Sequence, residues 1–222
     1  MWARAIQRAS YRLCTIPVYF GIAIVKLLNY KPVILDLEKC VAAVNYFQGR
    51  HRAEVTGSLL RALVVAEDHR SSMHFGVDPI AILRSIKVRV LQGKRQGAST
   101  IEQQFVRTIT ARYEKTPRRK LREQILAVML SSRFDKDAIS ASYLKVAYYG
   151  VSLAGVSGMR ILKSGNQEFA DEIIVAHLKY PRTANYEGMM AKKHSVRVGH
   201  IKMLLARESE FVNSSGEDVA AL

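Results

Sequence analysis

Residues 67–76 read EDHRSSMHFG, and the interpretation of the whole chain starts from this stretch. It places two carboxylates at the end of an apolar run. A polar segment led by glycine, GASTIEQQ at residues 97–104, then opens a second run, and RKLRE at residues 119–123 frames a carboxylate with cations. Glu67 and Glu123 suit glycosyl transfer, because one carboxylate can take a proton from an attacking hydroxyl while cations hold an anionic leaving group.

Helix signals surround these segments. Asp78 before Pro79 predicts a helix start. Ser99 and Glu102 fit a capping box that opens the following helix. Thr116 before residue 117, a proline, predicts another helix start. No alternating strand pattern is convincing, so the sequence predicts a mainly α fold.

The apolar spacing within these helices predicts which faces are buried. In the helix after Asp78, the predicted buried face consists of Ile80, Leu83, Ile86 and Val90. In the helix after Thr116, it consists of Leu121, Ile125 and Val128. On that second helix, Arg119, Lys120 and Glu123 are three or four positions apart and therefore share one flank.

The three segments, in this order, resemble glycosyltransferase family 51, the peptidoglycan glycosyltransferases that polymerise lipid II. The family's patterns read roughly E-D-x-x-F-x-x-H-x-G, G-[GA]-S-T-[IL]-T-Q-Q, R-K-x-x-E and K-x-x-I-L-x-x-Y-L-N. The matching positions are Glu67, Asp68, His74, Gly76, Gly97, Ser99, Thr100, Gln103, Gln104, Arg119, Lys120, Glu123, Lys136, Ile139, Tyr143 and Leu144. Three positions depart from the patterns, namely Ser71 for Phe, Glu102 for Thr and Lys145 for Asn.

The resemblance implies a lysozyme-like, mainly helical domain that joins lipid-linked sugars with inversion at the anomeric carbon and releases a polyprenyl pyrophosphate. It implies that Glu67 is the general base and that Glu123 lies near the donor pyrophosphate. The remaining implied substrate-binding residues are Asp68, His74, Ser99, Thr100, Gln104, Arg107, Arg119 and Lys120. A divalent cation, Mg²⁺ or Mn²⁺, is the expected cofactor beside the pyrophosphate, and no nucleotide is needed.

Each of these residues also has an ordinary structural interpretation. An isolated glutamate at a helix end is usually solvated, and Ser99 or Thr100 could only cap a helix. His74 alone would be an ordinary structural histidine; the sequence has no second His or Cys at ligand spacing, which argues against zinc, and no metal-ligating residues are predicted. The basic residues at 119 and 120 could form a solvated face or a membrane-surface patch.

Composition agrees with one globular domain that meets a negatively charged partner. The chain has 222 residues, a formal net charge of +15 and a pI near 10.0. Such a charge favours nucleic acid, anionic lipid or phosphate-bearing substrates. No nucleic-acid module is recognisable, so the expected partners are lipid II, polyprenyl-linked glycan, membrane lipids and other cell-wall synthesis proteins, without nucleic acid. Cys14 and Cys40 are expected to be thiols.

The N-terminus predicts a membrane anchor. Arg4, Arg8 and Arg12 precede a mostly apolar run over residues 13–28, which is short for a span, and Trp2 could anchor at the interface. A cleaved signal peptide and a helix in the membrane plane are the alternatives. The predicted organisation is an anchor over residues 1–30, a glycosyltransferase domain over 31–208 and a flexible tail over 209–222. The expected location is the bacterial inner membrane, single-pass, with the domain on the outer face.

Two other functions remain open from the sequence. One is a catalytically weak protein that binds lipid-linked saccharides and assists another polymerase. The three departures from the family patterns motivate it. The other is a lysozyme-like glycan hydrolase, against which stands the cation-rich half of the site, since a glycosidase does not need it.

Overall fold

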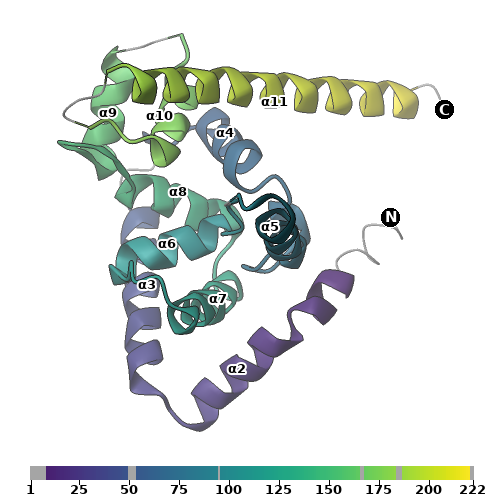
Figure 1. Ribbon diagram of the computed structural model, residues 1–222, viewed down its shortest axis with the longest axis vertical. Helices are drawn as coiled ribbons and strands as arrows, with labels where there is room; N and C mark the ends of the chain where they lie inside the picture. The colour runs from purple at the N-terminus through teal and green to yellow at the C-terminus, as the bar shows by residue number, and fades with distance from the viewer. Residues whose placement is uncertain (1–8, 50–53, 95, 166–167, 184–186, 221–222) are drawn as a thin grey trace. The chain divides into compact units, whose positions relative to one another are not determined.

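The computed structural model describes residues 9–49, 54–94, 96–165, 168–183 and 187–220, and these are mainly helical, as predicted (Figure 1). The chain divides into two compact units. The first unit combines Met1–Arg52 with Asp68–Val146, and the second combines Ala53–Glu67 with Ala147–Leu222. Glu67 and Asp68, neighbours in the chain, therefore belong to different units.

The first unit is built from helices. Its elements are α2 (Ile16–Leu27), α3 (Lys31–Gly49), the short 3-10 helix η2 (Ser71–Met73), α5 (Pro79–Gln92), α6 (Ile101–Thr110), α7 (Pro117–Ser131) and α8 (Lys136–Val146). Helix α6 packs against α3, α7 and α8. Phe105 of α6, Leu126 and Leu130 of α7, and Leu144 of α8 are fully buried, so α6 lies at the centre of this core.

Helix starts in the first unit follow the sequence signals. Asp78 caps α5 by accepting a hydrogen bond from the backbone N–H of Ala81 at 2.9 Å. Thr116 caps α7 in the same way through the N–H of Arg119 at 3.1 Å. Both predicted starts are confirmed, because capping depends on residues only three positions apart.

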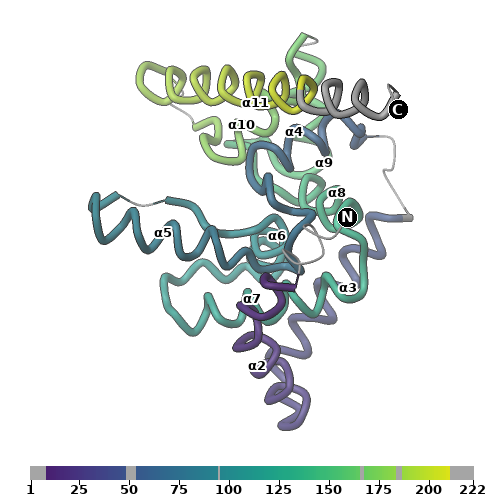
Figure 2. The backbone as a smooth tube through the Cα atoms, turned by 90° about the vertical axis from the view of Figure 1, so that its right-hand side faces the viewer, coloured from purple at the N-terminus to yellow at the C-terminus, as the bar shows by residue number. Residues whose placement is uncertain are grey.

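The predicted buried face of α5 is wrong. Ile80, Leu83, Ile86 and Val90 are all exposed, with Val90 75% exposed, and only Ala81 of this helix is buried. Figure 2 shows α5 extending outward from the region of α6 and α7. An apolar stripe identifies a face that avoids water, but it does not say what covers that face. Leu121 of α7 is also largely exposed, whereas Ile125 and Val128 are buried as predicted.

Helix α2 packs against α7. Val18, Ile22 and Val25 are buried, and a Cβ added at Gly21 would lie 2.9 Å from the Cδ1 atom of Ile125, so the two helices approach closely there. The opposite face is exposed and also apolar. It includes Ile16, Phe20, Ile24 and Leu27.

The predicted single-pass anchor over residues 13–28 is not confirmed. Helix α2 ends at Leu27, and Asn29 takes the left-handed φ of 46° that commonly ends a helix. Among the described residues, no helix is by itself both long and apolar enough to cross a membrane; α2 taken together with residues 31–48 meets that test, but the pair is bent by 106°. Figure 1 shows this bend. The predicted anchor residues Trp2, Arg4 and Arg8 lie outside the described residues.

The second unit contains α4 (Gly57–Glu67), strands β1 (Tyr148–Gly150) and β2 (Leu153–Ala154), α9 (Gly155–Gly165), α10 (Ala170–Lys179) and α11 (Met189–Ala220). The strands form a small antiparallel hairpin that the sequence did not predict. Gly150 adopts φ +147°, and a Cβ there would lie 2.4 Å from the carbonyl oxygen of Arg182. Because β1 and β2 have only three and two residues, they are too short for an alternating pattern.

Two further predictions concern the cysteines and the C-terminal residues. Cys14 and Cys40 are free thiols, as expected. Helix α11 spans Met189–Ala220, and the flexible tail over residues 209–222 stays a prediction.

Candidate active site

Glu123 is the centre of a cluster of cations. It lies on α7 with its side chain only 3% exposed. Arg107 of α6 donates to both carboxylate oxygens at 2.8 and 3.2 Å, and Arg119 donates to one of them. The ammonium of Lys120 lies 3.6 Å from the other. We call Arg107, Arg119, Lys120 and Glu123 the cation cluster. The predicted flank of Arg119, Lys120 and Glu123 is confirmed, since all three side chains meet.

The start of α6 supports this cluster. The hydroxyl of Ser99 accepts hydrogen bonds from Lys120 at 2.8 Å and from Arg107 at 3.2 Å. The side-chain carbonyl of Gln103 accepts another from Lys120 at 2.5 Å. Ser99 was predicted to contact the substrate, and Gln103 was not singled out although it matched the second family pattern. The structure brings both to Lys120, because one turn of α6 faces α7.

The predicted capping box at Ser99 and Glu102 is wrong. Thr100 is the N-cap of α6, accepting from the backbone N–H of Gln103 at 3.3 Å. The hydroxyl of Thr100 also donates to the carbonyl of Gly76 at 2.8 Å, which ties α6 to the loop before α5. Glu102 instead pairs with Lys136 of α8. The pattern alone could not exclude Thr100, since Ser and Thr are both good N-caps.

Three cations around one carboxylate leave this part of the site with an excess of positive charge. Burial lowers the pKa of Lys120 to about 8; the charge of Glu123 opposes this, and those of Arg107 and Arg119 reinforce it. An anion bound beside Lys120 would relieve the repulsion among the cations. Arginine and lysine donors held in this way are the groups that proteins use for phosphate.

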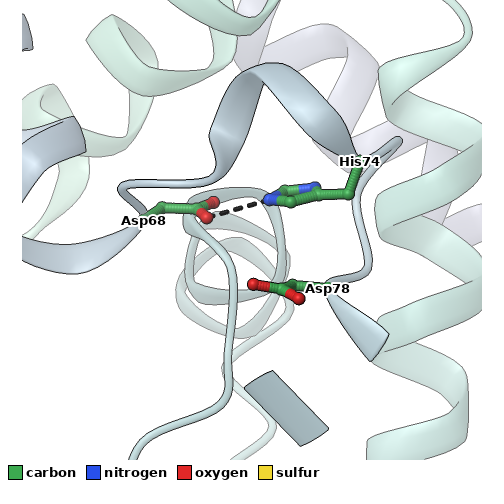
Figure 3. A group of neighbouring side chains, drawn as sticks. All are labelled: Asp68, His74 and Asp78. Atoms are coloured by element: carbon green, nitrogen blue, oxygen red, sulfur yellow. Dashed lines mark hydrogen bonds and ion pairs between the residues drawn. The ribbon is translucent and has the colours of Figure 1, made fainter. Parts of the chain in front are cut away.

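A second group joins the loop over residues 68–78 to the helices. The Nε2 atom of His74 lies 2.8 Å from Oδ1 of Asp68 (Figure 3). The Oδ2 atom of Asp68 accepts a hydrogen bond from the backbone N–H of Ile101 at 3.3 Å. Asp78 accepts from the guanidinium of Arg70 at 2.9 Å. The side chains of Asp68, His74 and Asp78 are all buried. Asp68 and His74, predicted to bind substrate, are therefore occupied in holding this loop on α6.

Asp68, His74 and Asp78 also form a potential metal site. One ligand atom from each lies within 4.8 Å of the others, close enough to share one cation. In the present arrangement these donors are committed to hydrogen bonds, and Arg70 already neutralises Asp78. The expected cation beside Glu123 fits less well, because the oxygens of that carboxylate already accept from Arg107 and Arg119.

Glu67 lies in the second unit, at the end of α4, and is half-buried. Arg197 of α11 donates to its Oε1 atom at 3.0 Å and to the carbonyl of Ala66 at 2.7 Å. The sequence did not predict Arg197, because 130 residues separate it from Glu67 and nothing in the family patterns pairs them. Gln104, in the first unit, accepts a hydrogen bond from the hydroxyl of Tyr143 at 2.8 Å.

The second unit also holds a cavity of about 460 Å³ that the sequence did not indicate. His177 and His194 line it, and their rings stack with centroids 4.0 Å apart. His177 bonds to the backbone carbonyl of Tyr180 and His194 to that of Ile173. Burial, with the neighbouring His194, lowers the pKa of His177 to about 4, so this ring is neutral near pH 7.

The three departures from the family patterns are all buried in the first unit. Ser71 lies in η2 and is 6% exposed, and Glu102 pairs with Lys136. Lys145 donates to the carbonyl of Phe47 at 3.0 Å, where α8 packs on α3. None of the three joins the cation cluster, so that cluster is complete in this chain.

Comparison with known proteins identifies relatives of the chain. The family model described as Transglycosylase matches residues 44–160, which is just over half of the chain. Penicillin-binding protein 1A of Haemophilus influenzae is 39% identical over 139 residues, 60% of this chain. Penicillin-binding protein 1A of Aquifex aeolicus is 38% identical over 99 residues, and penicillin-binding protein 1B of Vibrio cholerae is 40% identical over 95, which are 44% and 42% of this chain.

The match to these curated relatives covers only a small part of them, 16%, 14% and 12% of their own lengths. The family model over residues 44–160 includes the cation cluster and Glu67. The chain therefore belongs to the transglycosylase family, glycosyltransferase family 51.

Proposed function

We propose that this protein is a peptidoglycan glycosyltransferase, which polymerises lipid II with inversion at the anomeric carbon and releases polyprenyl pyrophosphate. The observation that carries the proposal is the cation cluster, in which three cations surround the buried Glu123 of a transglycosylase-family chain. A pyrophosphate leaving group already carries charge and needs cations more than a proton. The cluster supplies those cations.

In this mechanism Glu67 is the general base that takes the proton from the attacking sugar hydroxyl. Arg197 holds the carboxylate of Glu67 through one oxygen. Arg107, Arg119 and Lys120 bind the donor pyrophosphate, and Glu123 keeps the three cations in place. Ser99 and Gln103 orient Lys120. No nucleotide takes part, since the pyrophosphate of the lipid carrier is itself the leaving group.

Asp68, His74 and Thr100 act on the substrate indirectly. Asp68 and Thr100 each bond to the backbone around the start of α6, and His74 bonds to Asp68. We assign them to positioning the loop over residues 68–78 and α6. The Tyr143 hydroxyl holds Gln104. A divalent cation at Asp68, His74 and Asp78 would have to displace the hydrogen bonds that these side chains already make.

We further propose that the protein acts at the outer face of the bacterial inner membrane, through a lysozyme-like domain over residues 31–208. Two exposed apolar faces in the first unit support contact with lipid. One is the outer face of α2, including Phe20 and Leu27, and the other is the face of α5 that includes Leu83 and Val90. Lys87 and Arg89 on α5 add basic charge that suits anionic headgroups.

The test is incubation of the detergent-purified protein with labelled lipid II, followed by electrophoresis of the products. Glycan strands longer than one disaccharide unit are expected. Tight lipid II binding without strands would instead favour a saccharide-binding protein. Shortening of added glycan strands would favour a hydrolase.

A further inference from the structure

Glu102 stands out among the departures from the family patterns, which have Thr at this position. Its side chain is 2% exposed, and one oxygen pairs with the ammonium of Lys136. Within the described part of the chain, the other oxygen, Oε2, is buried without a hydrogen-bond partner. A buried carboxylate oxygen left without a partner costs free energy. Glu102 is therefore a poor choice if stability alone is considered.

Lys136 connects Glu102 to the loop over residues 68–78. Its ammonium lies 3.4 Å from Nδ1 of His74, whose other ring nitrogen lies 2.8 Å from Asp68. Asp68 in turn accepts from the backbone N–H of Ile101 at the start of α6. These contacts form one continuous path from α6 through α8 and the loop, and back to α6. We call Asp68, His74, Glu102 and Lys136 the Glu102 network.

Donor and acceptor roles along this path follow from chemistry. An ammonium can only donate, so the Nδ1 atom that faces Lys136 must be the lone-pair nitrogen of His74. The proton of the neutral ring then sits on Nε2, where it is donated to Asp68. Lys136 has a flexible stem and its side chain is 27% exposed, so it could turn away to water. The charge of Glu102 keeps it beside His74.

The charge state of Glu102 supports this role. Burial alone would raise the pKa of Glu102, but the charge of Lys136 and the hydrogen bond from its ammonium outweigh burial and lower it. Glu102 is thus ionised near neutral pH and can hold a cation.

The start of α6 links the Glu102 network to the cation cluster. Gln103, next to Glu102, accepts a hydrogen bond from Lys120 at 2.5 Å and donates from its Nε2 atom to the carbonyl of Gly76 at 3.1 Å. Ser99, before the N-cap, accepts from the same ammonium at 2.8 Å. A shift of the loop or of this turn would therefore move the acceptors that aim Lys120.

We propose that Glu102 is a positioning residue, which holds Lys136 against His74 and so fixes the first turn of α6 and the acceptors of Lys120. This role rests on the proposed glycosyltransferase function, because Lys120 is there the ligand of the donor pyrophosphate. Glu102 touches no substrate.

A merely structural ion pair is the competing explanation. Replacing both members of a buried ion pair is often neutral or stabilising, while removing one member is costly. A variant that keeps the ion pair but exchanges the positions of its carboxylate and its ammonium can therefore separate a positioning role from a merely structural one. The exchange Glu102→Lys with Lys136→Glu rebuilds the ion pair but puts a carboxylate opposite Nδ1 of His74.

The experiment compares Glu102→Gln, the exchange variant and the unmodified protein by melting temperature and by kcat and KM on lipid II. Glu102→Gln should lower both melting temperature and kcat. The exchange should recover the melting temperature while kcat stays about tenfold or more below the unmodified value, with KM within about twofold, because misplacement of a bound group costs turnover. Recovery of kcat together with the melting temperature, or normal kcat in Glu102→Gln, would overturn the proposal.

Two further measurements make the test decisive whatever the exchange variant does. If it does not fold, Glu102→Thr combined with Lys136→Met removes the pair: folded protein with the same loss of kcat supports the proposal, and near-normal kcat refutes it. If the unmodified protein makes no glycan, the proposed function fails, and ¹⁵N chemical shifts of the His74 ring then decide. The network is supported if the His74 proton lies on Nε2 in the unmodified protein and if Glu102→Gln shows a mixture of the Nε2–H and Nδ1–H tautomers. The same tautomer in both proteins rejects the network.

Discussion

The guanidinium of Arg107 donates hydrogen bonds to both carboxylate oxygens of Glu123, from Nε at 2.8 Å to one and from Nη2 at 3.2 Å to the other. This pair joins α6 to α7. Because Arg119 also donates to Glu123, the carboxylate is occupied by cations and is badly placed to accept a proton from substrate. In the proposed mechanism it organises the cations and leaves the base role to Glu67.

Glu123→Gln should therefore lower turnover without abolishing affinity for anions. Removing one member of a buried ion pair is expected to cost about 3 kcal/mol of folding free energy. The cations left behind should bind a pyrophosphate-bearing analogue as tightly as before or tighter, while kcat falls, since their arrangement is lost. Chemical denaturation, calorimetric titration and the lipid II assay measure these three effects. Weaker analogue binding with unchanged kcat would mean that Glu123 itself binds the donor.

Activity should decline on the alkaline side near pH 8. The pKa of Lys120 in the folded protein is about 8, below the ordinary lysine value, so its charge is present below pH 8 and lost as the pH rises through it. The alkaline limb of a kcat/KM profile reports groups of the free enzyme. Lys120→Arg should move this limb to higher pH, because arginine stays charged. Lys94→Arg is the control and should leave the alkaline limb where it is in the unmodified protein. If Lys120→Arg also leaves the limb unchanged, a group other than Lys120 causes it.

Glu67→Gln should fold normally and lose polymerisation by about 100-fold or more, the low end of general-base contributions. Folding should survive, because Arg197 keeps its bond to the carbonyl of Ala66 and can still donate to the amide oxygen. Glu208→Gln is the matched control. Glu208 forms a surface ion pair with Arg61 at 2.8 Å, and such pairs contribute little. Near-normal turnover of purified Glu67→Gln would remove Glu67 from the base role.

The two faces of α2 should respond differently to substitution. Ile22→Ala on the buried face should cost about 2–3 kcal/mol of stability, in the range measured for large-to-small core changes. Phe20→Ser combined with Leu27→Ser on the exposed face should leave the melting temperature nearly unchanged but weaken binding to anionic vesicles. Flotation of the purified variants with vesicles measures the second effect. Equal vesicle binding by the Phe20 and Leu27 variant would exclude this face as the lipid contact.

Acid should destabilise the second unit through His177. Its folded pKa is about 4, below the ordinary 6.5, so the unfolded state binds more protons between these values. Stability from the neutral ring is complete above pH 6.5 and is lost as the pH falls toward 4. The loss amounts to about 3 kcal/mol at 1.36 kcal/mol per pKa unit. Denaturant unfolding of His177→Gln should show a weaker dependence on pH in this window, whereas exposed His200→Gln should match the unmodified protein.

Sequence alone determined what depends on near neighbours in the chain. The caps at Asp78 and Thr116 follow from residues three positions apart, and the flank shared by Arg119 and Glu123 follows from helical geometry. The ordered patterns identified the family, because so many matches in the same order are unlikely to arise by chance. The predicted site residues Arg107, Lys120 and Glu123 meet in one cluster.

Tertiary structure decided which groups from distant segments meet. It gave Glu102 the distant partner Lys136 where a local capping box was predicted, and it placed Arg197 on Glu67. It also left the apolar stripe of α5 exposed and packed α2 against α7. An apolar stripe is more stable when it is buried, and a buried charged side chain needs a partner. Packing among distant segments determines which segment covers the stripe and which group pairs with the charge, since many different partners are compatible with the same local pattern.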